Sequence, residues 1–459
     1  MEYYENAREY IRWIRNGFIC VYVLYLIFLQ TKLTVYCSTY CVHNMSRILY
    51  KGLPVIGMVI AGTDLAMNFK SLWKKENTFA IFFLMATLVS IIINYRYDFL
   101  ANVKTLFIMA MQLYIFYVIG VREARNEGRL LGVVANLYVA AWAIPVAISL
   151  YQFLIGYGIK LDKTFGEYEN SVVGFYGNRL FGVFGDPNYA AVGSILAIFF
   201  ALICLRKKKI WCKIYYIITI ILAWLYIVLS GSRTCLLAIV VSIPMVTCIC
   251  LIAYFRRNSI KNVYKFIVIP ATCVVLFGAI LGLVTVTKKV ALIRTEIIGT
   301  EVSLDRDDVV NSDNISNNRF AIWKDAVKIW ETTPVIGATP RGYLDYAKDV
   351  CGDLYIVKRG YMVHNGYISV LLFSGIIGAI VMLLWCISLA RSTVRLLVSK
   401  KISSEKHQRI VLLAVAQLAL VVAAMTLTMI FYSTTVVDVM FWGISGYLLS
   451  QRCDDEILY

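Results

Sequence analysis

Three side chains in this sequence could together bind and activate a phosphate ester: Arg179, Arg233 and His364. Arg233 lies in the stretch VLSGSRTCLL, which is the shortest gap between two long apolar runs, residues 211–229 and 235–254. A guanidinium group can hold phosphate oxygens through two parallel N–H bonds, so an arginine at a membrane boundary suits a phosphorylated ligand. The simpler interpretation is a side chain that extends from a helix end to lipid phosphate.

Arg179 begins a second candidate stretch, GNRLFGVFGDPNYAAVG, which precedes another apolar run. Asp186, followed by Pro187 and Asn188, is a helix-start signal. The free N–H groups and the positive end of a helix favour an anionic group. Asp186 and Asn188 are therefore predicted to form a structural cap near the site, and we favour this role for Asp186 over catalysis.

His364 lies in YMVHNGYISVLLFSGIIG, where a long polar segment enters an apolar run. A neutral imidazole could orient or deprotonate a hydroxyl group. Arginines beside it would stabilise a diphosphate as it leaves. The three residues together therefore predict transfer of a sugar from a polyprenyl diphosphate to an acceptor hydroxyl.

Two carboxylate motifs offer weaker alternatives. Residues 305–308, DRDD, have the Asp-x-Asp spacing of transferases that use a metal and a nucleotide sugar. We favour a solvated loop for them, because they are predicted on the side away from cytosolic nucleotide sugars. Asp438, in TTVVDVMFW, lies near the start of the last apolar run. It is either a functional intramembrane acid or the partner of an arginine at the same membrane face.

The elements that must position these residues are membrane helices. Hydrophobic residues make up 60% of the 459 residues, and the mean hydropathy is +0.71. Repeated apolar runs of roughly 18 or more residues are typical of spanning helices. We predict an all-α polytopic protein that forms a single membrane domain over residues 1–459. Its twelve spans are expected at about 17–36, 50–68, 78–94, 100–120, 130–155, 189–205, 211–229, 235–254, 264–286, 366–390, 410–430 and 435–450.

The positive charge of the chain follows these spans. With a cytoplasmic N-terminus, the inner segments hold 25 of the 45 Lys and Arg residues, while most outer gaps are short and poor in them. This asymmetry predicts a multi-pass protein of the cytoplasmic membrane with both termini in the cytoplasm. Much of the net charge of +17 then reflects topology, so we expect membrane lipid and not nucleic acid as a partner.

Two outer segments are long, residues 156–188 and 287–365. The second is a large extracytoplasmic loop before the tenth span. Within it, the pattern of residues 317–331 predicts a helix. Its apolar face carries Phe320, Trp323, Val327 and Trp330. Such a helix either lies on the membrane surface or packs on a small core of the loop itself.

Four stretches in order carry a family resemblance: RLFGVFGDPNYAA, SGSRTCLLAI, NRFAIWKDAVKIWETTPVIG and VHNGYISVLLFSGIIG. Together with the large loop before the histidine, they resemble the O-antigen ligase and polymerase family over roughly residues 130–390. The resemblance implies a membrane glycosyltransferase that uses undecaprenyl-diphosphate-linked glycans. It also implies that neither a metal nor a nucleotide sugar is needed, so no cofactor is expected.

The resemblance also implies roles for individual residues. Arg179 and Arg233 match the arginines that hold the donor diphosphate, and Arg319 matches the arginine of the loop helix. His364 matches the histidine that acts on the acceptor hydroxyl. This sequence departs from the family where a G-x-G turn usually follows the loop helix, because residues 337–342 read GATPRG.

We therefore predict an inverting, metal-independent glycosyltransferase of surface polysaccharide (capsule or O-antigen) synthesis. It would join lipid-linked oligosaccharide units at the outer face, with an acceptor that is a glycan or a lipid-linked glycan. Polymerisation is favoured over ligation to a lipid-core acceptor. The alternatives from other classes are a lipid-linked oligosaccharide flippase and a protein that only scaffolds an envelope complex. A flippase should carry charged residues along several spans, whereas the charges singled out here gather at one face.

Overall fold

Helices account for nearly all of the regular structure. A computed structural model gives the fold of residues 2–32, 40–123, 128–162, 171–205, 209–259, 262–298, 304, 318–400 and 402–451. The long helices are α1 (Glu2–Leu29), α3 (Tyr40–Met67), α4 (Thr78–Ile93), α5 (Phe99–Gln112), α7 (Arg129–Leu154), α8 (Pro187–Cys204), α9 (Ile210–Leu229), α10 (Arg233–Arg257), α11 (Asn262–Ile298), α13 (Arg319–Thr332), α16 (Gly366–Val398), α17 (Ser404–Ala423) and α18 (Val436–Ser450). The shorter ones are η1 (Phe69–Ser71), η2 (Lys75–Asn77), the π-helix η3 (Leu113–Val118), α6 (Ile119–Glu123), α14 (Tyr343–Cys351) and α15 (Tyr355–Arg359).

The prediction of an all-α polytopic membrane protein is confirmed. Ten helical stretches in the described part of the chain are long and apolar enough to cross a membrane. The two other predicted spans coincide with α3 and α18. At 15 residues, α18 is shorter than the roughly 17 residues that usually span a bilayer. Its residues are buried by protein on nearly all sides, so it is a central helix of the bundle.

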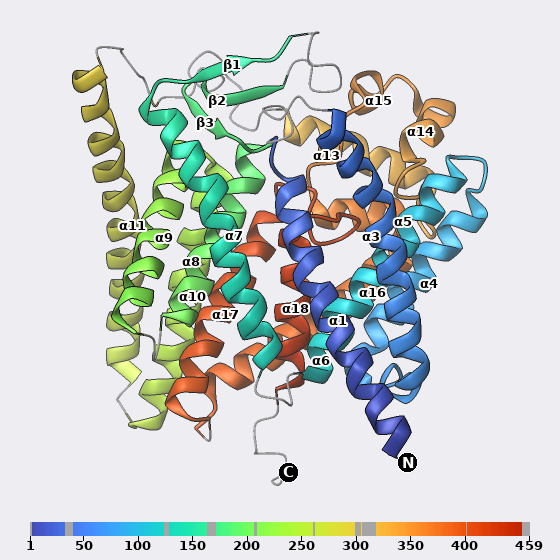
Figure 1. Ribbon diagram of the computed structural model, residues 1–459, viewed down its shortest axis with the longest axis horizontal. Coiled ribbons are helices and arrows are strands. Elements are labelled where there is room, and N and C mark those ends of the chain that lie inside the picture. Colours follow the sequence, from blue (N-terminus) through green and yellow to red (C-terminus); the bar gives the residue numbers. More distant parts are fainter. Residues whose placement is uncertain are drawn as a thin grey trace.

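The bundle has two distinct ends (Figure 1). Strands β1 (Gly158–Lys160), β2 (Val172–Tyr176) and β3 (Arg179–Gly182) lie at one end with α13, α14 and α15; we call it the sheet end. The start of α1 lies at the opposite end, the terminal end. Helices α8, α10, α16 and α18 all begin at the sheet end. The helix ends that carry most of the predicted inner basic residues meet at the terminal end, which agrees with the charge asymmetry of the sequence.

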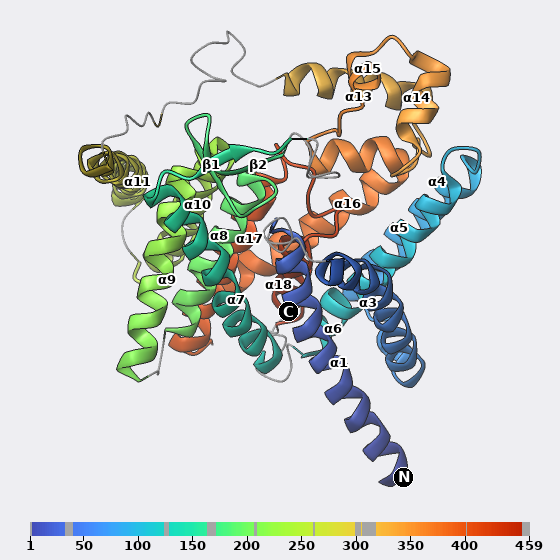
Figure 2. The ribbon, with the colours of Figure 1, turned by 45° about the horizontal axis from the view of Figure 1, so that its top comes forward.

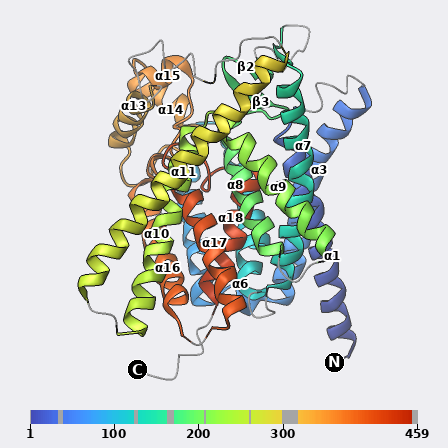
Figure 3. The same ribbon diagram turned by 90° about the vertical axis from the view of Figure 1, so that its left-hand side faces the viewer.

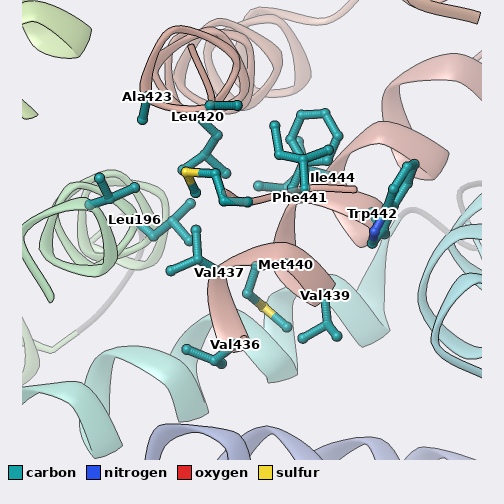
Figure 4. Packing of buried hydrophobic residues seen from close by; sticks show 14 of the residues in the cluster. Leu196, Leu420, Ala423, Val436, Val437, Val439, Met440, Phe441, Trp442 and Ile444 are labelled. Atoms are coloured by element: carbon teal, nitrogen blue, oxygen red, sulfur yellow. The ribbon is translucent and has the colours of Figure 1, made fainter. Parts of the chain in front are cut away.

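The core of the bundle surrounds α18. Val437, Met440 and Phe441 of α18 are buried near Leu196 of α8 and Leu420 of α17 (Figure 4). By contrast, the predicted ninth span, α11, runs obliquely across the outside of α9 and α10 (Figure 3). Its apolar side chains are largely exposed to the surroundings, as expected for a helix that faces lipid.

A small antiparallel sheet forms within residues 156–188, which the sequence predicted only as a long outer segment. Its strand order is β1-β2-β3, with a register shift between Gly174 and Phe175. The sheet is joined to the end of α1 by a bridge between Thr31 and Phe184. It therefore positions Arg179, the first residue of β3, above the starts of the helices.

Helix α16 is broken near its start. Gly375 has φ 62° and ψ −165°, which a residue with a side chain would adopt only with strain. A Cβ atom on Gly375 would lie 2.2 Å from the carbonyl oxygen of Val335, and one on Gly337 would lie 2.6 Å from the nitrogen of Gly375. The loop that follows α13 thus packs directly against the break in α16 (Figure 2). This contact holds residues 337–342, the stretch that departs from the expected G-x-G turn.

The predicted eleventh span was too long at its C-terminal end. Helix α17 stops at Ala423, and the backbone of residues 424–435 is irregular. Ile430 and Tyr432 have φ values of 73° and 56°, which side chains rarely adopt. The apolar composition of this segment is typical of a helix, but its backbone groups form hydrogen bonds to other elements. We call residues 424–435 the hub segment.

Candidate functional site

The hub segment connects the starts of four helices at the sheet end. For α16, the nitrogen of Gly366 donates to Ala424 O at 2.8 Å. For α8, the Tyr189 hydroxyl donates to Thr428 O at 2.7 Å. For α10, the hydroxyls of Thr234 and Thr426 lie 2.7 Å apart. For α18, the nitrogen of Ile430 donates to the Asp438 carboxylate. Four helix N-termini therefore meet around one polar segment, and their dipoles favour an anionic ligand there.

Two of the predicted arginines contact the turn between α9 and α10 or the first turn of α10. Arg179 donates from Nε to Ser230 O at 2.9 Å and from an Nη to Asn188 Oδ1 at 3.0 Å. Arg319, at the start of α13, donates to Thr234 Oγ1 at 3.4 Å. Arg233 lies between these two points of contact, as the first residue of α10. The structure thus gathers Arg179, Arg233 and Arg319, which are far apart in the sequence, around one turn.

Arg233 itself is exposed. Ser232 caps the helix that Arg233 begins, by accepting from the nitrogen of Cys235 at 3.4 Å. Within the described part of the chain, the Arg233 guanidinium makes no hydrogen bond or ion pair with another residue. Its side chain is therefore available to a ligand, and its backbone is fixed by the cap.

His364 is partly buried just before α16. Its φ of 51° lies in the left-handed region, which costs a non-glycine residue free energy and is found most often at functional sites. Burial lowers the pKa of His364 first, and the positive charge of Arg319 lowers it further, while Asp186 opposes the shift. The lowered pKa favours the neutral imidazole, which is able to accept a proton. The same charges indicate that Arg319 and Asp186 lie close to this imidazole.

The predicted helix start at Asp186 is present, with a different division of roles. Asp186 is the N-cap of α8, and its carboxylate accepts from the nitrogens of Asn188 and Tyr189. Asn188 was predicted as part of the cap, and it takes part through its backbone nitrogen, which donates to the Asp186 carboxylate. Its side-chain oxygen accepts from Arg179 instead, because the residue lies within the first helical turn and its side chain turns toward β3. Asn188 thus positions an arginine.

Asp438 is fully buried, and its described partners are not arginines. Its carboxylate accepts from the nitrogen of Ile430, and from the nitrogen and hydroxyl of Thr435 at 2.8 and 2.7 Å. Thr435 and Asp438 form the capping box of α18. The acid therefore holds the hub segment onto the start of α18, and the alternative of pairing with an arginine is not what the structure shows.

A cavity of about 350 Å³, with both polar and apolar groups in its wall, lies beside the hub segment. Its wall includes Asp186, Tyr189, Thr428, Ser433, Thr435, Met362 and Arg341. Hydroxyl, carboxylate and guanidinium groups next to an aromatic ring are suited to binding a sugar. The sequence analysis missed the hub segment and Arg341. The polar run Ser433-Thr434-Thr435 between two apolar stretches is the signal that could have found the former.

The buried face of helix α13 overlaps only in part with the predicted apolar face. The buried residues are Ile322, Ala326 and Ile329, together with Asp325. Phe320 is 67% exposed, and Trp323 packs edge-on against it with ring centroids 5.4 Å apart. Trp323 and Trp330 of the predicted face are partly buried against the core, whereas Phe320 is exposed to the surroundings. The motif at residues 305–308 lies outside the described residues.

The fold and these side chains define a polytopic membrane protein with an arginine-rich polar site at one end of its helix bundle. Residues 218–383 match the family model for O-antigen ligase. This match confirms the resemblance over that part of the chain. It covers Arg233, Arg319 and His364, but not Arg179. Comparison with curated proteins finds no match to the chain.

Proposed function

We propose that the chain is a glycosyltransferase that transfers or polymerises undecaprenyl-diphosphate-linked oligosaccharides in surface polysaccharide synthesis. The observation that carries this proposal is the gathering of Arg179, Arg233 and Arg319 around one helix start, with a neutral His364 near Arg319. Arginines in this arrangement suit a diphosphate, and a neutral histidine suits an alcohol.

The proposed reaction follows from these roles. The acceptor hydroxyl oxygen attacks the anomeric carbon of the donor sugar, and His364 takes the hydroxyl proton. The bond between that carbon and the diphosphate oxygen breaks, and the undecaprenyl diphosphate leaves with the electron pair. Arg233 and its neighbours stabilise the negative charge that develops on the leaving group. Attack opposite the leaving group inverts the anomeric centre, and no metal is required.

We favour polymerisation over ligation to a lipid-core acceptor. The test is product analysis with the purified full-length protein and a lipid-linked repeat as the only glycan, in the presence of a strong chelator. A ladder of longer products would support a metal-independent polymerase. Products that appear only when a lipid-core acceptor is added would support a ligase. If Mg²⁺ or Mn²⁺ were needed to restore activity, the metal-independent reaction would be wrong.

We place the sheet end outside the cytoplasmic membrane and both termini in the cytoplasm, following the distribution of basic residues. Cysteines introduced at Asp353 and Ser404 test this orientation, because Asp353 lies at the sheet end and Ser404 begins α17 at the terminal end. An impermeant maleimide added to whole cells should label only the first, above the background of the parent chain. Labelling of only the second would reverse the orientation.

A further inference from the structure

The residue that follows α1, Gln30, belongs to the wall of the cavity beside the hub segment. The chain at this point is bonded to the residues that precede α8, because Gln30 O accepts from the nitrogen of Gly185 at 2.9 Å. The next residue, Thr31, forms the bridge with Phe184. The backbone of Gln30 is therefore fixed close to Asp186, the N-cap of α8.

The side-chain amide of Gln30 has no such anchor. Its Oε1 and Nε2 atoms are buried, and neither forms a hydrogen bond within the part of the chain that the structure describes. Thr428 of the hub segment is a second case. Its carbonyl oxygen accepts from Tyr189, but its buried Oγ1 has no partner among the described residues. Because an unpaired buried polar group costs stability, two of them in one cavity wall indicate a role other than stabilising the fold.

The same wall offers aromatic rings as well as polar groups. Tyr189 and Tyr432 belong to it, and both hydroxyls are bonded elsewhere, the first to Thr428 O at 2.7 Å and the second to the Thr87 hydroxyl at 2.9 Å. A sugar ring matches such a wall, because it has hydroxyl groups at its edge and C–H groups on its faces. A bare phosphate would leave the aromatic groups without a contact, and a hydrocarbon tail would leave the amide and the hydroxyl unpaired.

The cavity borders the proposed reaction centre. Its wall includes Met362, two residues before His364, and Asp186, whose charge acts on the imidazole. The bonds that cap α8 use only Oδ1 of Asp186, so Oδ2 is a further acceptor at this wall. The volume of about 350 Å³ lies near the lower end of the range of about 300–1,000 Å³ that is usual for small-ligand pockets. The cavity therefore suits a sugar residue that reacts beside His364.

We propose that Gln30 and Thr428 select the sugar, by binding neighbouring hydroxyl groups of the residue that reacts beside His364. An amide supplies both donors and an acceptor, and a threonine hydroxyl acts as either, so the pair matches two hydroxyls of one ring. Since no described residue bonds the amide, it can turn toward a sugar without losing a hydrogen bond. This inference rests on the proposed function and names the residues that give that function its specificity.

The first measurement separates this role from a structural one. Gln30→Leu and Thr428→Val replace unpaired polar groups with apolar groups of similar size, so the melting temperature should stay the same or rise. With the lipid-linked glycan that accumulates in cells lacking the protein, kcat/KM should nevertheless fall about tenfold to a hundredfold. Gln408→Leu and Thr285→Val alter exposed residues outside this cavity wall and should change neither quantity.

The second measurement identifies the hydroxyl groups. Synthetic lipid-linked repeats that lack one hydroxyl, either on the sugar that carries the diphosphate or on the sugar at the other end, are compared with the complete repeat. The parent protein should discriminate against at least one of these deoxy repeats. Gln30→Leu or Thr428→Val should lose most of that discrimination, because the buried partner of the missing hydroxyl is already gone. The end of the repeat at which discrimination is lost shows whether the pair binds the donor or the acceptor.

Other results would overturn this assignment. A fall in melting temperature that parallels the fall in activity would make Gln30 a structural residue. Normal activity in both variants would mean that water alone is the partner of Gln30 and Thr428. Unchanged discrimination against the deoxy repeats would leave the choice of sugar to other residues. In these three cases transfer by the parent protein would still support the proposed function. If the parent transfers no sugar from the complete repeat, the proposed function itself fails, and the assignment fails with it.

Discussion

The two ends of the helix bundle hold their arginines in different ways. At the terminal end, Arg15 is 2% exposed and is paired with Asp64 at 3.2 Å and Glu123 at 2.8 Å. Arg122 pairs with the same Asp64 at 2.8 Å, and the Tyr114 hydroxyl donates to it at 2.7 Å. Two arginines and two carboxylates thus balance one another among α1, α3 and α6.

At the sheet end, the contacts described for three arginines include neutral oxygen atoms. Arg179 donates to a carbonyl and an amide oxygen, Arg319 to a threonine hydroxyl, and Arg341 to another. Such contacts fix a guanidinium group without neutralising its charge. Arg233, at a helix start, has no carboxylate partner in the described part of the chain.

This difference indicates that the charged residues of the terminal end stabilise the fold, and that those of the sheet end serve function. A balanced, buried ion network locks helices together, and removal of one member leaves an uncompensated charge. An arginine such as Arg233, at a helix start and without a carboxylate partner in the described residues, keeps its charge for an anion. Substitutions at the terminal end should therefore change stability, and substitutions at the sheet end should change activity.

The largest expected effect is at the terminal end. Asp64→Ala should lower the free energy of unfolding by about 3–5 kcal/mol, because Arg15 and Arg122 would share one fewer carboxylate in a buried site. Thermal unfolding of the purified protein would measure the loss, with Asp345→Ala as an exposed ion-pair control that should change little. A normal melting temperature for Asp64→Ala would show that the ion network does not stabilise the fold.

His364→Ala should have the largest effect at the sheet end. Loss of the proposed general base should lower the rate of transfer by about 10²- to 10⁴-fold, because His364 is the group proposed to take the hydroxyl proton. Donor binding should stay near normal, since the proposed partner of His364 is the acceptor. His407→Ala provides the matched control at the terminal end. Transfer at the normal rate by His364→Ala would remove the histidine from the mechanism.

Arg233→Lys tests whether the geometry of the arginine matters in addition to its charge. Lysine keeps the positive charge and loses the planar fork, so the rate should fall about 10²-fold, equivalent to about 3 kcal/mol of leaving-group stabilisation. The melting temperature should be unchanged, because Arg233 is exposed. Normal polymer length in cells at a normal protein level would instead favour an arginine that only contacts lipid phosphate.

The smallest effect is a displacement of the pH profile. Activity that needs a neutral His364 is present above the lowered pKa of this group and is lost as the pH falls through it. Arg319→Gln removes a charge that lowers this pKa, so the acid limb of residual activity should move to higher pH. Asp186→Asn keeps a helix cap and removes a charge that raises the pKa, so the limb should move to lower pH. Movement of both limbs in one direction would contradict the proposed role of His364.

The sequence by itself determined the membrane class and the approximate positions of the spans. Long apolar runs cannot be hidden in a soluble protein, and the bilayer sets the length of each run. The motifs likewise singled out Arg233 and His364, because a charged or titratable side chain at the edge of an apolar run is conspicuous. The helix starts at Asp186 and Arg233 were local signals as well, since a cap depends on residues only a few positions apart.

Only the tertiary structure decided which residues meet. The hub segment has the composition of a helix, and its irregular backbone is stabilised by bonds to α8, α10, α16 and α18 that no local pattern encodes. Arg341 lies in the wall of the cavity beside the hub segment because its loop packs against the break at Gly375 and is hydrogen-bonded to α5. Helix α5 is more than two hundred residues away in the sequence. Hydropathy records which residues avoid water, but the close approach of distant backbones depends on packing across the whole bundle.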